Sequence, residues 1–201
     1  MMDLCHYCTL SPSSSSSNSS SSSSSSSSTC VGSLIECRTC FLVKYCSKAH
    51  QRADRKRHSL ICIVNKQDMD GNTPLYNACE NGYLTEVQSL ITRGAVVNQP
   101  NRRGITNLYI ATLEGHVEIV RLLCEKGAVL DVQTDHGETA LHVASAWGHL
   151  EIVRFLWEKG ANLNIKTKDK ETALEMAFER GHIDIYDFLI EVGAVLCEDP
   201  C

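Results

Sequence analysis

The feature that most limits how this chain can fold is an interval of 33 residues that recurs from Asp68 onward. Gly71, Gly104 and Gly137 follow one another at this interval, and Lys170 takes the fourth place. Further residues keep the same spacing: Gly94, Gly127, Gly160 and Gly193; Leu75, Leu108, Leu141 and Leu174; Ala78, Ala111, Ala144 and Ala177. A unit of this length cannot bury its apolar face alone, so such units stack on their neighbours. We therefore expect an array of similar units.

Each unit carries the signals of a tight turn followed by two short helices. Asp70-Gly71 suits a hairpin tip with a positive φ, and Thr73-Pro74 places a capping hydroxyl before a proline in the first helical turn. The second helix has apolar residues at helical spacing, as in residues 117–123. A repeated glycine ends the first helix, and a histidine follows it in three units, which we interpret as structural: Gly82, Gly115, Gly148 and Gly181; His116, His149 and His182.

This pattern resembles the ankyrin repeat family. The four repeats would occupy residues 68–100, 101–133, 134–166 and 167–196. Three features depart from the family: Lys170 stands at a tip where glycine is usual, Thr106-Asn107 lacks the proline, and no further capping repeat follows. Terminal repeats have one neighbour only and fray first. We therefore expect the preceding segment to cover the first repeat through Leu60, Ile61, Ile63 and Val64.

The resemblance also implies a concave surface of hairpin tips and inner helices that binds other proteins. Carried over by repeat position, the expected contacts include Arg102, Arg103, Asp135 and His136 at the tips, and Leu113 and Trp147 at helix ends. Large side chains at such positions are typical of interface anchors. The alternative is that Leu113 and Trp147 pack on the neighbouring repeat.

A second group of residues, upstream of the repeats, has the spacing of metal ligands. The segment reads Cys37-x2-Cys40-x5-Cys46-x3-His50-x7-His58-x3-Cys62, and Cys5-His6-Tyr7-Cys8 stands before it. Two cysteines separated by two residues can present both sulfurs to one metal from a tight turn. Eight such side chains make two closed sites of four ligands, and closed zinc sites are structural because catalytic zinc keeps one position for water.

Residues 37–62 resemble a MYND-type zinc finger, a family in which two zinc sites interleave. The resemblance implies one zinc on Cys5, Cys8, Cys46 and His50, and a second on Cys37, Cys40, His58 and Cys62. His50 stands where the family usually has Cys, and Arg55 where it usually has Trp beside a groove for proline-rich peptides. The Arg55 substitution weakens the expectation of peptide binding. Cys30 is an alternative to Cys5 or Cys8.

The sequence therefore predicts a mainly α chain in two parts. Residues 1–62 would form a small double-zinc module, interrupted by a disordered serine-rich insertion at 11–29, and residues 68–196 a solenoid of four ankyrin repeats. Residues 1–66 hold eight Lys and Arg against three Asp and Glu, and residues 67–201 hold eleven against twenty-one. The basic cluster at 52–57 is more often a solvated helix face than a nucleic-acid site.

These features favour a non-enzymatic adaptor that binds proteins. No Gly-rich phosphate loop and no order of Ser, His and Asp typical of hydrolases is present in the sequence. No apolar run reaches the length of about 18 residues that a membrane span needs. Metal ligation by the six cysteines of the two predicted zinc sites requires reduced thiols, so we expect a location in the cytoplasm, the nucleus or both. The alternatives are a zinc-finger transcriptional regulator and a ubiquitin-pathway adaptor.

Overall fold

The computed structural model describes residues 35–36, 44–45 and 63–195, and the chain divides into two units, Met1–Ile63 and Val64–Cys201. In the first unit, strands β1 (Ile35–Glu36) and β2 (Lys44–Tyr45) pair in antiparallel orientation. Ile35 lies opposite Tyr45, and Glu36 lies opposite Lys44. The chain therefore reverses direction between residues 36 and 44.

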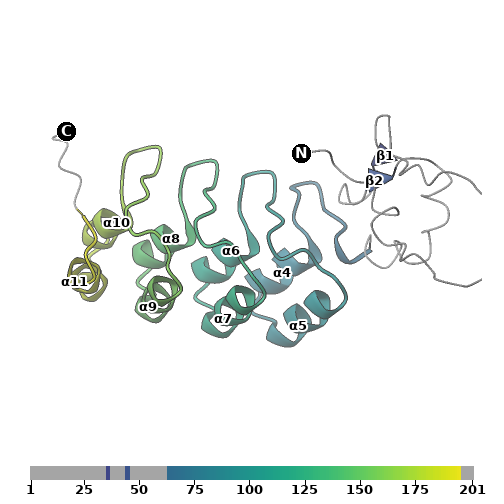
Figure 1. The fold of residues 1–201 in the computed structure, drawn as a ribbon, viewed down its shortest axis with the longest axis horizontal. Coiled ribbons are helices and arrows are strands. Elements are labelled where there is room, and N and C mark those ends of the chain that lie inside the picture. The colour runs from purple at the N-terminus through teal and green to yellow at the C-terminus, as the bar shows by residue number, and fades with distance from the viewer. Residues whose placement is uncertain (1–34, 37–43, 46–62, 196–201) are drawn as a thin grey trace, which may run out of the picture. The chain divides into compact units, whose positions relative to one another are not determined.

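The described part of the second unit consists of paired helices joined by turns (Figure 1). Their bounds are α4 Pro74–Glu80, α5 Leu84–Thr92, α6 Asn107–Leu113, α7 Val117–Glu125, α8 Ala140–Ala146, α9 Leu150–Glu158, α10 Ala173–Glu179 and α11 Ile183–Glu191. The even-numbered helices form one row and the odd-numbered ones a second row, with the loops projecting beside the first row. The predicted mainly α repeat array is confirmed for these residues. None of the described helices has the length and apolar character needed to span a bilayer.

A threonine begins every inner helix, by which we mean α4, α6, α8 and α10. Thr73, Thr106 and Thr172 each accept a hydrogen bond at Oγ1 from the backbone N–H three residues later. This bond satisfies one of the N–H groups that a helix start leaves without an internal partner. The inner helices therefore begin where the sequence predicted, including the one at Thr106 that lacks proline.

Small and branched apolar residues fill the space between the repeats. The repeated leucines at 75, 108, 141 and 174 are at most 2% exposed, and the repeated alanines three residues later are at most 3% exposed. Alanine lets neighbouring inner helices approach closely, while each leucine buries a larger apolar side chain. We call α5, α7, α9 and α11 the outer helices. Their buried residues Ile119, Ile152 and Ile185 belong to the same core.

The repeated contacts begin at Val64, four residues before Asp68. Asn65 donates from Nδ2 to the Gly94 carbonyl at 3.1 Å and accepts at Oδ1 from the Val96 N–H at 2.8 Å. Asn98 makes the same pair of bonds in the next repeat. Of the residues expected to cover the first repeat, Val64 is buried and Ile63 is 63% exposed. Leu60 and Ile61 lie outside the described residues.

Candidate functional site

The turn at each tip is built around one polar side chain. Asn101 accepts at Oδ1 from the N–H groups of Arg103 (2.9 Å) and Ile105 (3.0 Å). Asp68 and Thr134 make the same pattern, accepting from the residues two and four positions later. These bonds tie the backbone of the turn while leaving the tip side chains outside it. The tips are therefore ordered supports for exposed side chains.

Backbone hydrogen bonds join each tip to the next. The N–H groups of Arg102, Asp135 and Lys168 donate to the carbonyls of Asp70 (3.1 Å), Arg103 (3.0 Å) and His136 (2.9 Å). The four tips thus form one bonded row, and the distance between neighbouring tip side chains is set by the backbone.

This close approach explains the glycine at the interior tips. Gly137 has φ of 82°, and a Cβ at this position would lie 2.8 Å from the backbone nitrogen of Lys168. A side chain would therefore meet both the left-handed backbone and the next repeat. Lys170 is the one residue other than glycine with a positive φ among the described residues, and its tip belongs to the last repeat that the structure describes.

The four tip residues that the sequence predicted as contacts are all exposed. Arg102 and Arg103 occupy the second tip, and Asp135 and His136 occupy the third. The bonded row places these two tips next to each other, so the two arginines lie one tip away from Asp135.

The two large side chains predicted at the helix ends differ in their surroundings. Trp147, the residue that caps the C-terminal end of α8, is 59% exposed. Leu113 is half-buried and packs against the hydrophobic core, and its carbonyl accepts a bond from His149 Nε2 at 3.2 Å. The Leu113 side chain therefore contributes to the core, whereas Trp147 is mostly exposed to solvent.

The repeated histidines link each repeat to the one before it, which is consistent with the structural role that the sequence predicted. Nε2 of His116, His149 and His182 lies 3.2 Å from the carbonyl oxygens of Glu80, Leu113 and Ala146 respectively. The ring lies against the glycine that ends the preceding inner helix, where a Cβ would come within 2.7 Å of it. These imidazoles therefore hold carbonyl groups at the ends of inner helices.

Two polar groups beside the tips escaped the sequence analysis. The Tyr109 hydroxyl donates to Glu138 Oε2 at 2.7 Å, and burial together with this carboxylate raises the pKa of Tyr109. His142, at the equivalent position one repeat later, is 1% exposed, and burial lowers its pKa. The sequence carries a signal for them, because residues 76, 109, 142 and 175 are Tyr, Tyr, His and Glu, which marks a position with a polar group in every repeat.

The cysteines of the described repeats behave as core residues. Cys79 is fully buried, and burial raises the pKa of its thiol to about 12. Burial also raises the pKa of Cys124 to about 11, although Lys159 acts in the opposite direction. Thiols at such values are protonated at neutral pH and are poor nucleophiles or metal ligands. Cys79 is therefore an inert thiol of the core.

The predicted zinc ligands lie outside the described residues. They are Cys5, Cys8, Cys46 and His50 of the first set, and Cys37, Cys40, His58 and Cys62 of the second. Cys30 and Arg55 also lie outside. Strands β1 and β2, which directly precede Cys37 and Cys46, are the described elements nearest to them.

Comparison with known proteins addresses the family of the chain. A family model described as ankyrin repeats (3 copies) matches residues 40–134 and 128–198. No curated protein gives a significant match. The matched ranges cover most of the sequence and include all the described helices, whose threonine caps, glycine ends and linked tips recur at the 33-residue interval. The chain belongs to the ankyrin repeat family.

Proposed function

We propose that this protein is a non-enzymatic adaptor that binds a protein partner along the tips and inner helices of its repeats. Ankyrin repeats suggest a role in protein–protein interaction, and the observation that carries the proposal here is the exposure of Trp147. An indole that is 59% exposed at the end of a short helix leaves a large apolar area in water. Such side chains are frequent among the few residues that dominate the energy of an interface.

The tips would supply selectivity around this anchor. Arg102 and Arg103 favour carboxylates of the partner, and the adjacent Asp135 favours a cation. Exposed ion pairs contribute only about 0.2–1 kcal/mol each, whereas a well-packed tryptophan anchor contributes about 2 kcal/mol or more. Affinity would therefore depend mainly on Trp147, and the tip charges would set orientation and the rate of association.

The test compares two tryptophan variants of the full chain. Quantitative affinity purification with Trp147→Ala should lose the partner proteins that the unmodified chain retains. Trp157→Ala is the matched control, because Trp157 is also exposed but lies on the outer helix α9, where its ring packs edge-on against Phe188. Equal recovery of partners by both variants, or a fall in the melting temperature of Trp147→Ala that matches its loss of binding, would contradict the proposal.

We further propose that the first unit is a MYND-like module that holds two structural zinc ions. Its support is the chemistry of the eight ligands, which are six cysteines and two histidines at spacings typical of zinc sites. Eight such side chains complete two closed sites of four ligands each.

Elemental analysis of the purified full chain tests the module. We expect two zinc ions per chain and about one in a His50→Ala variant, because a closed site needs all four ligands. One zinc that the variant leaves unchanged would restrict the site to Cys37, Cys40, His58 and Cys62. The ankyrin match begins at residue 40 and so overlaps this segment, and zinc content below one ion per chain would favour repeat structure there instead.

Two further properties follow from this proposal. Reduced cysteines suit the cytoplasm or the nucleus, where thiols are kept available for metal ligation. A proline-rich peptide is the ligand class that the zinc module would take. Arg55, in place of the usual tryptophan, would weaken the affinity for that peptide.

A further inference from the structure

The face of the last repeat that points away from the other repeats differs from every earlier one. Position 79 and its equivalents 112 and 145 are Cys, Thr and Ser, all 0% exposed, because the next repeat covers them. The equivalent residue of the last repeat is Phe178, which is 61% exposed. Position 87 and its equivalents 120 and 153 are fully buried valines. The equivalent residue of the last repeat is Tyr186, which is half-buried.

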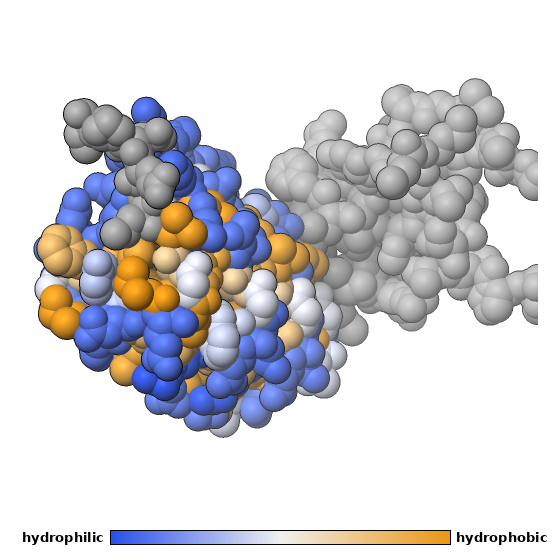
Figure 2. Space-filling model, turned by 60° about the vertical axis from the view of Figure 1, so that its left-hand side comes forward, coloured by the Kyte–Doolittle hydropathy of each residue, from blue (hydrophilic) through white to orange (hydrophobic). Residues whose placement is uncertain are grey.

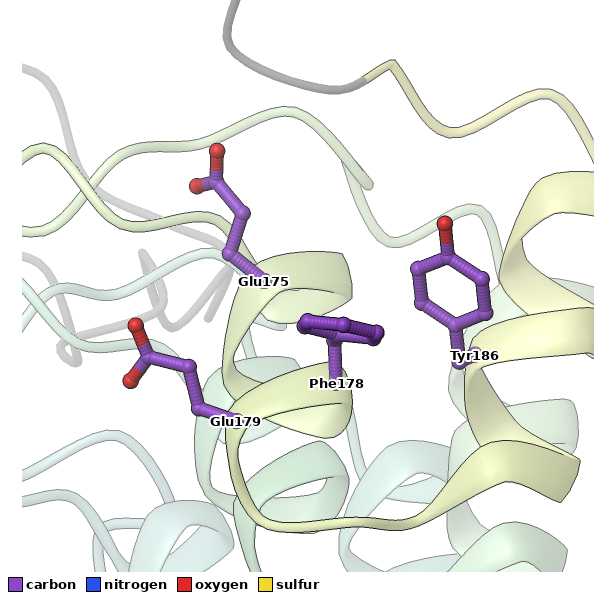
Figure 3. A pocket seen from close by; sticks show the side chains of 4 residues that line it. All are labelled: Glu175, Phe178, Glu179 and Tyr186. Carbon is purple, nitrogen blue, oxygen red and sulfur yellow. The ribbon is translucent and has the colours of Figure 1, made fainter. Parts of the chain in front are cut away.

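These two aromatic residues line an open pocket on the end of the solenoid. Phe178 of α10 and Tyr186 of α11 have ring centroids 5.4 Å apart with an interplanar angle of 49°. Together with Glu175 and Glu179 they line a cavity of about 310 Å³. Figure 3 shows Phe178 between the two carboxylates on one side and Tyr186 on the other. We call these four residues the end pocket.

The surroundings of the end pocket combine an apolar floor with negative charge. In Figure 2 this end of the second unit comes forward and carries hydrophobic residues bordered by hydrophilic ones. Burial raises the pKa of nearby Glu171, and the negative charges of Glu179, Asp169 and Glu175 add to this effect, while Arg180 opposes it. Glu175 Oε2 accepts bonds from the Thr172 N–H and hydroxyl, which holds this carboxylate in place.

The negative charge of the end pocket distinguishes among the molecules that could cover this face. A second copy docked by the same face would bring Glu175 and Glu179 against their own equivalents, because a twofold interface pairs a surface with itself. The chain's own residues 196–201 include Glu198 and Asp199 and neither Lys nor Arg. Both occupants would add negative charge to a negative pocket. A cationic group is the complementary occupant.

We propose that the end pocket binds an arginine side chain of a partner protein, with the guanidinium stacked on Phe178 and paired with Glu179. The ring supplies cation–π attraction and the carboxylate accepts hydrogen bonds from the planar guanidinium. The chain already uses this geometry between repeats, where the guanidinium carbon of Arg121 lies 4.8 Å from the Phe155 centroid and that of Arg154 lies 4.7 Å from the Phe188 centroid.

This inference rests on the proposed function only in that both concern a protein partner. The end pocket includes neither Trp147 nor the tip residues Arg102, Arg103, Asp135 and His136, so separate variants test the two sites. If Trp147→Ala did not change partner binding, the proposed function would fail but the end-pocket proposal would stand. If the end-pocket variants did not change peptide binding, the end-pocket proposal would fail but the proposed function would stand.

The test uses the full chain and a seven-residue peptide of glycine and serine with one central arginine. We expect saturable shifts of the Phe178 and Tyr186 ring resonances in NMR titrations. The same peptide with citrulline, a neutral isostere of arginine, should cause none. Phe178→Ser, which restores the residue type of position 145, should weaken binding roughly tenfold. Trp147→Ala should bind the peptide as the unmodified chain does.

Glu179→Gln gives a second, less disruptive test, since Glu179 is exposed and the change removes only its charge. It should weaken peptide binding roughly threefold, and added salt should weaken binding to the unmodified chain. Equal binding of the arginine and citrulline peptides would overturn the proposal. So would shifts confined to residues outside the end pocket, or a dimer in sedimentation measurements that Phe178→Ser abolishes, which would identify a second copy as the occupant.

Discussion

The second and third repeats and the last repeat share one backbone pattern but differ at the residues that meet a following neighbour. The interior repeats carry Gly104 and Gly137 at the tips and small residues such as Ser145 on the inner helix. The last repeat carries Lys170 and Phe178 at the equivalent places. The comparison teaches that the neighbour, and not the fold of the repeat itself, restricts these positions. In the last described repeat, larger or charged side chains occupy the positions that glycine and small residues occupy in the interior repeats.

The largest effect should come from placing the residue of the last tip in an interior tip. Gly137→Lys would put a Cβ within 2.8 Å of the Lys168 nitrogen and force a lysine into a left-handed backbone at φ of 82°. We expect the free energy of unfolding to fall by about 3 kcal/mol, measured by urea denaturation followed by tryptophan fluorescence. A loss below about 1 kcal/mol would mean that the tips can separate easily.

The reverse exchange should have a smaller effect of opposite sign. Lys170 has φ of 66°, which costs a residue other than glycine about 1 kcal/mol. Lys170→Gly should therefore raise the free energy of unfolding by up to about 1 kcal/mol, less the greater backbone freedom that glycine has in the unfolded chain. The same denaturation experiment measures it, and destabilisation would show that contacts of the lysine side chain outweigh the strain.

The smallest effect concerns the position that holds His142 in the third repeat and Glu175 in the last. His142 Nδ1 accepts from the Thr139 N–H at 3.1 Å, Nε2 lies 2.9 Å from the Ile165 carbonyl, and burial lowers the pKa from its ordinary value of 6.5. Below pH 6.5 the unfolded chain gains a proton that the folded chain resists, so stability should fall as the pH drops from 6.5 towards the folded pKa.

A His142→Gln variant is the control for this pH dependence, since glutamine can accept the same capping bond and does not titrate. The unfolding free energy of the variant should change less between pH 7.5 and 5.5 than that of the unmodified chain. Both tryptophans of the sequence, Trp147 and Trp157, lie in the repeats, so their fluorescence reports on this unit. Parallel pH profiles would show that His142 does not control the dependence.

Much of the repeat architecture could be predicted because its causes are local or periodic. Threonine caps, glycine ends and alanine contacts recur at fixed spacing, and the structural role of His116 and its equivalents follows from their recurrence. The burial of Leu113 and the exposure of Trp147 could not be predicted in this way, since both are large residues at helix ends. Leu113 is the last residue of α6 and Trp147 is the residue after α8, and the structure shows Leu113 half-buried and Trp147 exposed.

The end pocket and the early start of the repeats required the three-dimensional structure for a different reason. Asn65 has a residue type that is common in any loop, and only its bonds to Gly94 and Val96 reveal it as the first member of a series. Phe178 and Tyr186 stand at positions that are hidden in the other repeats, so their sequence alone suggests core residues. Their exposure follows from what is stacked beside them.

The backbone bonds between tips also determine how the proposed binding surface responds to load. A force on the tip of Arg102 passes through the main chain to Asp70 on one side, and the Asp135 bond to Arg103 carries it to the other. Displacing one tip alone would break these bonds, so the low-energy deformation is a shared bend of the whole row. A partner bound along the tips would therefore have to match the spacing between them. A partner with a different spacing would bind weakly, because the resulting strain would be distributed over several repeats.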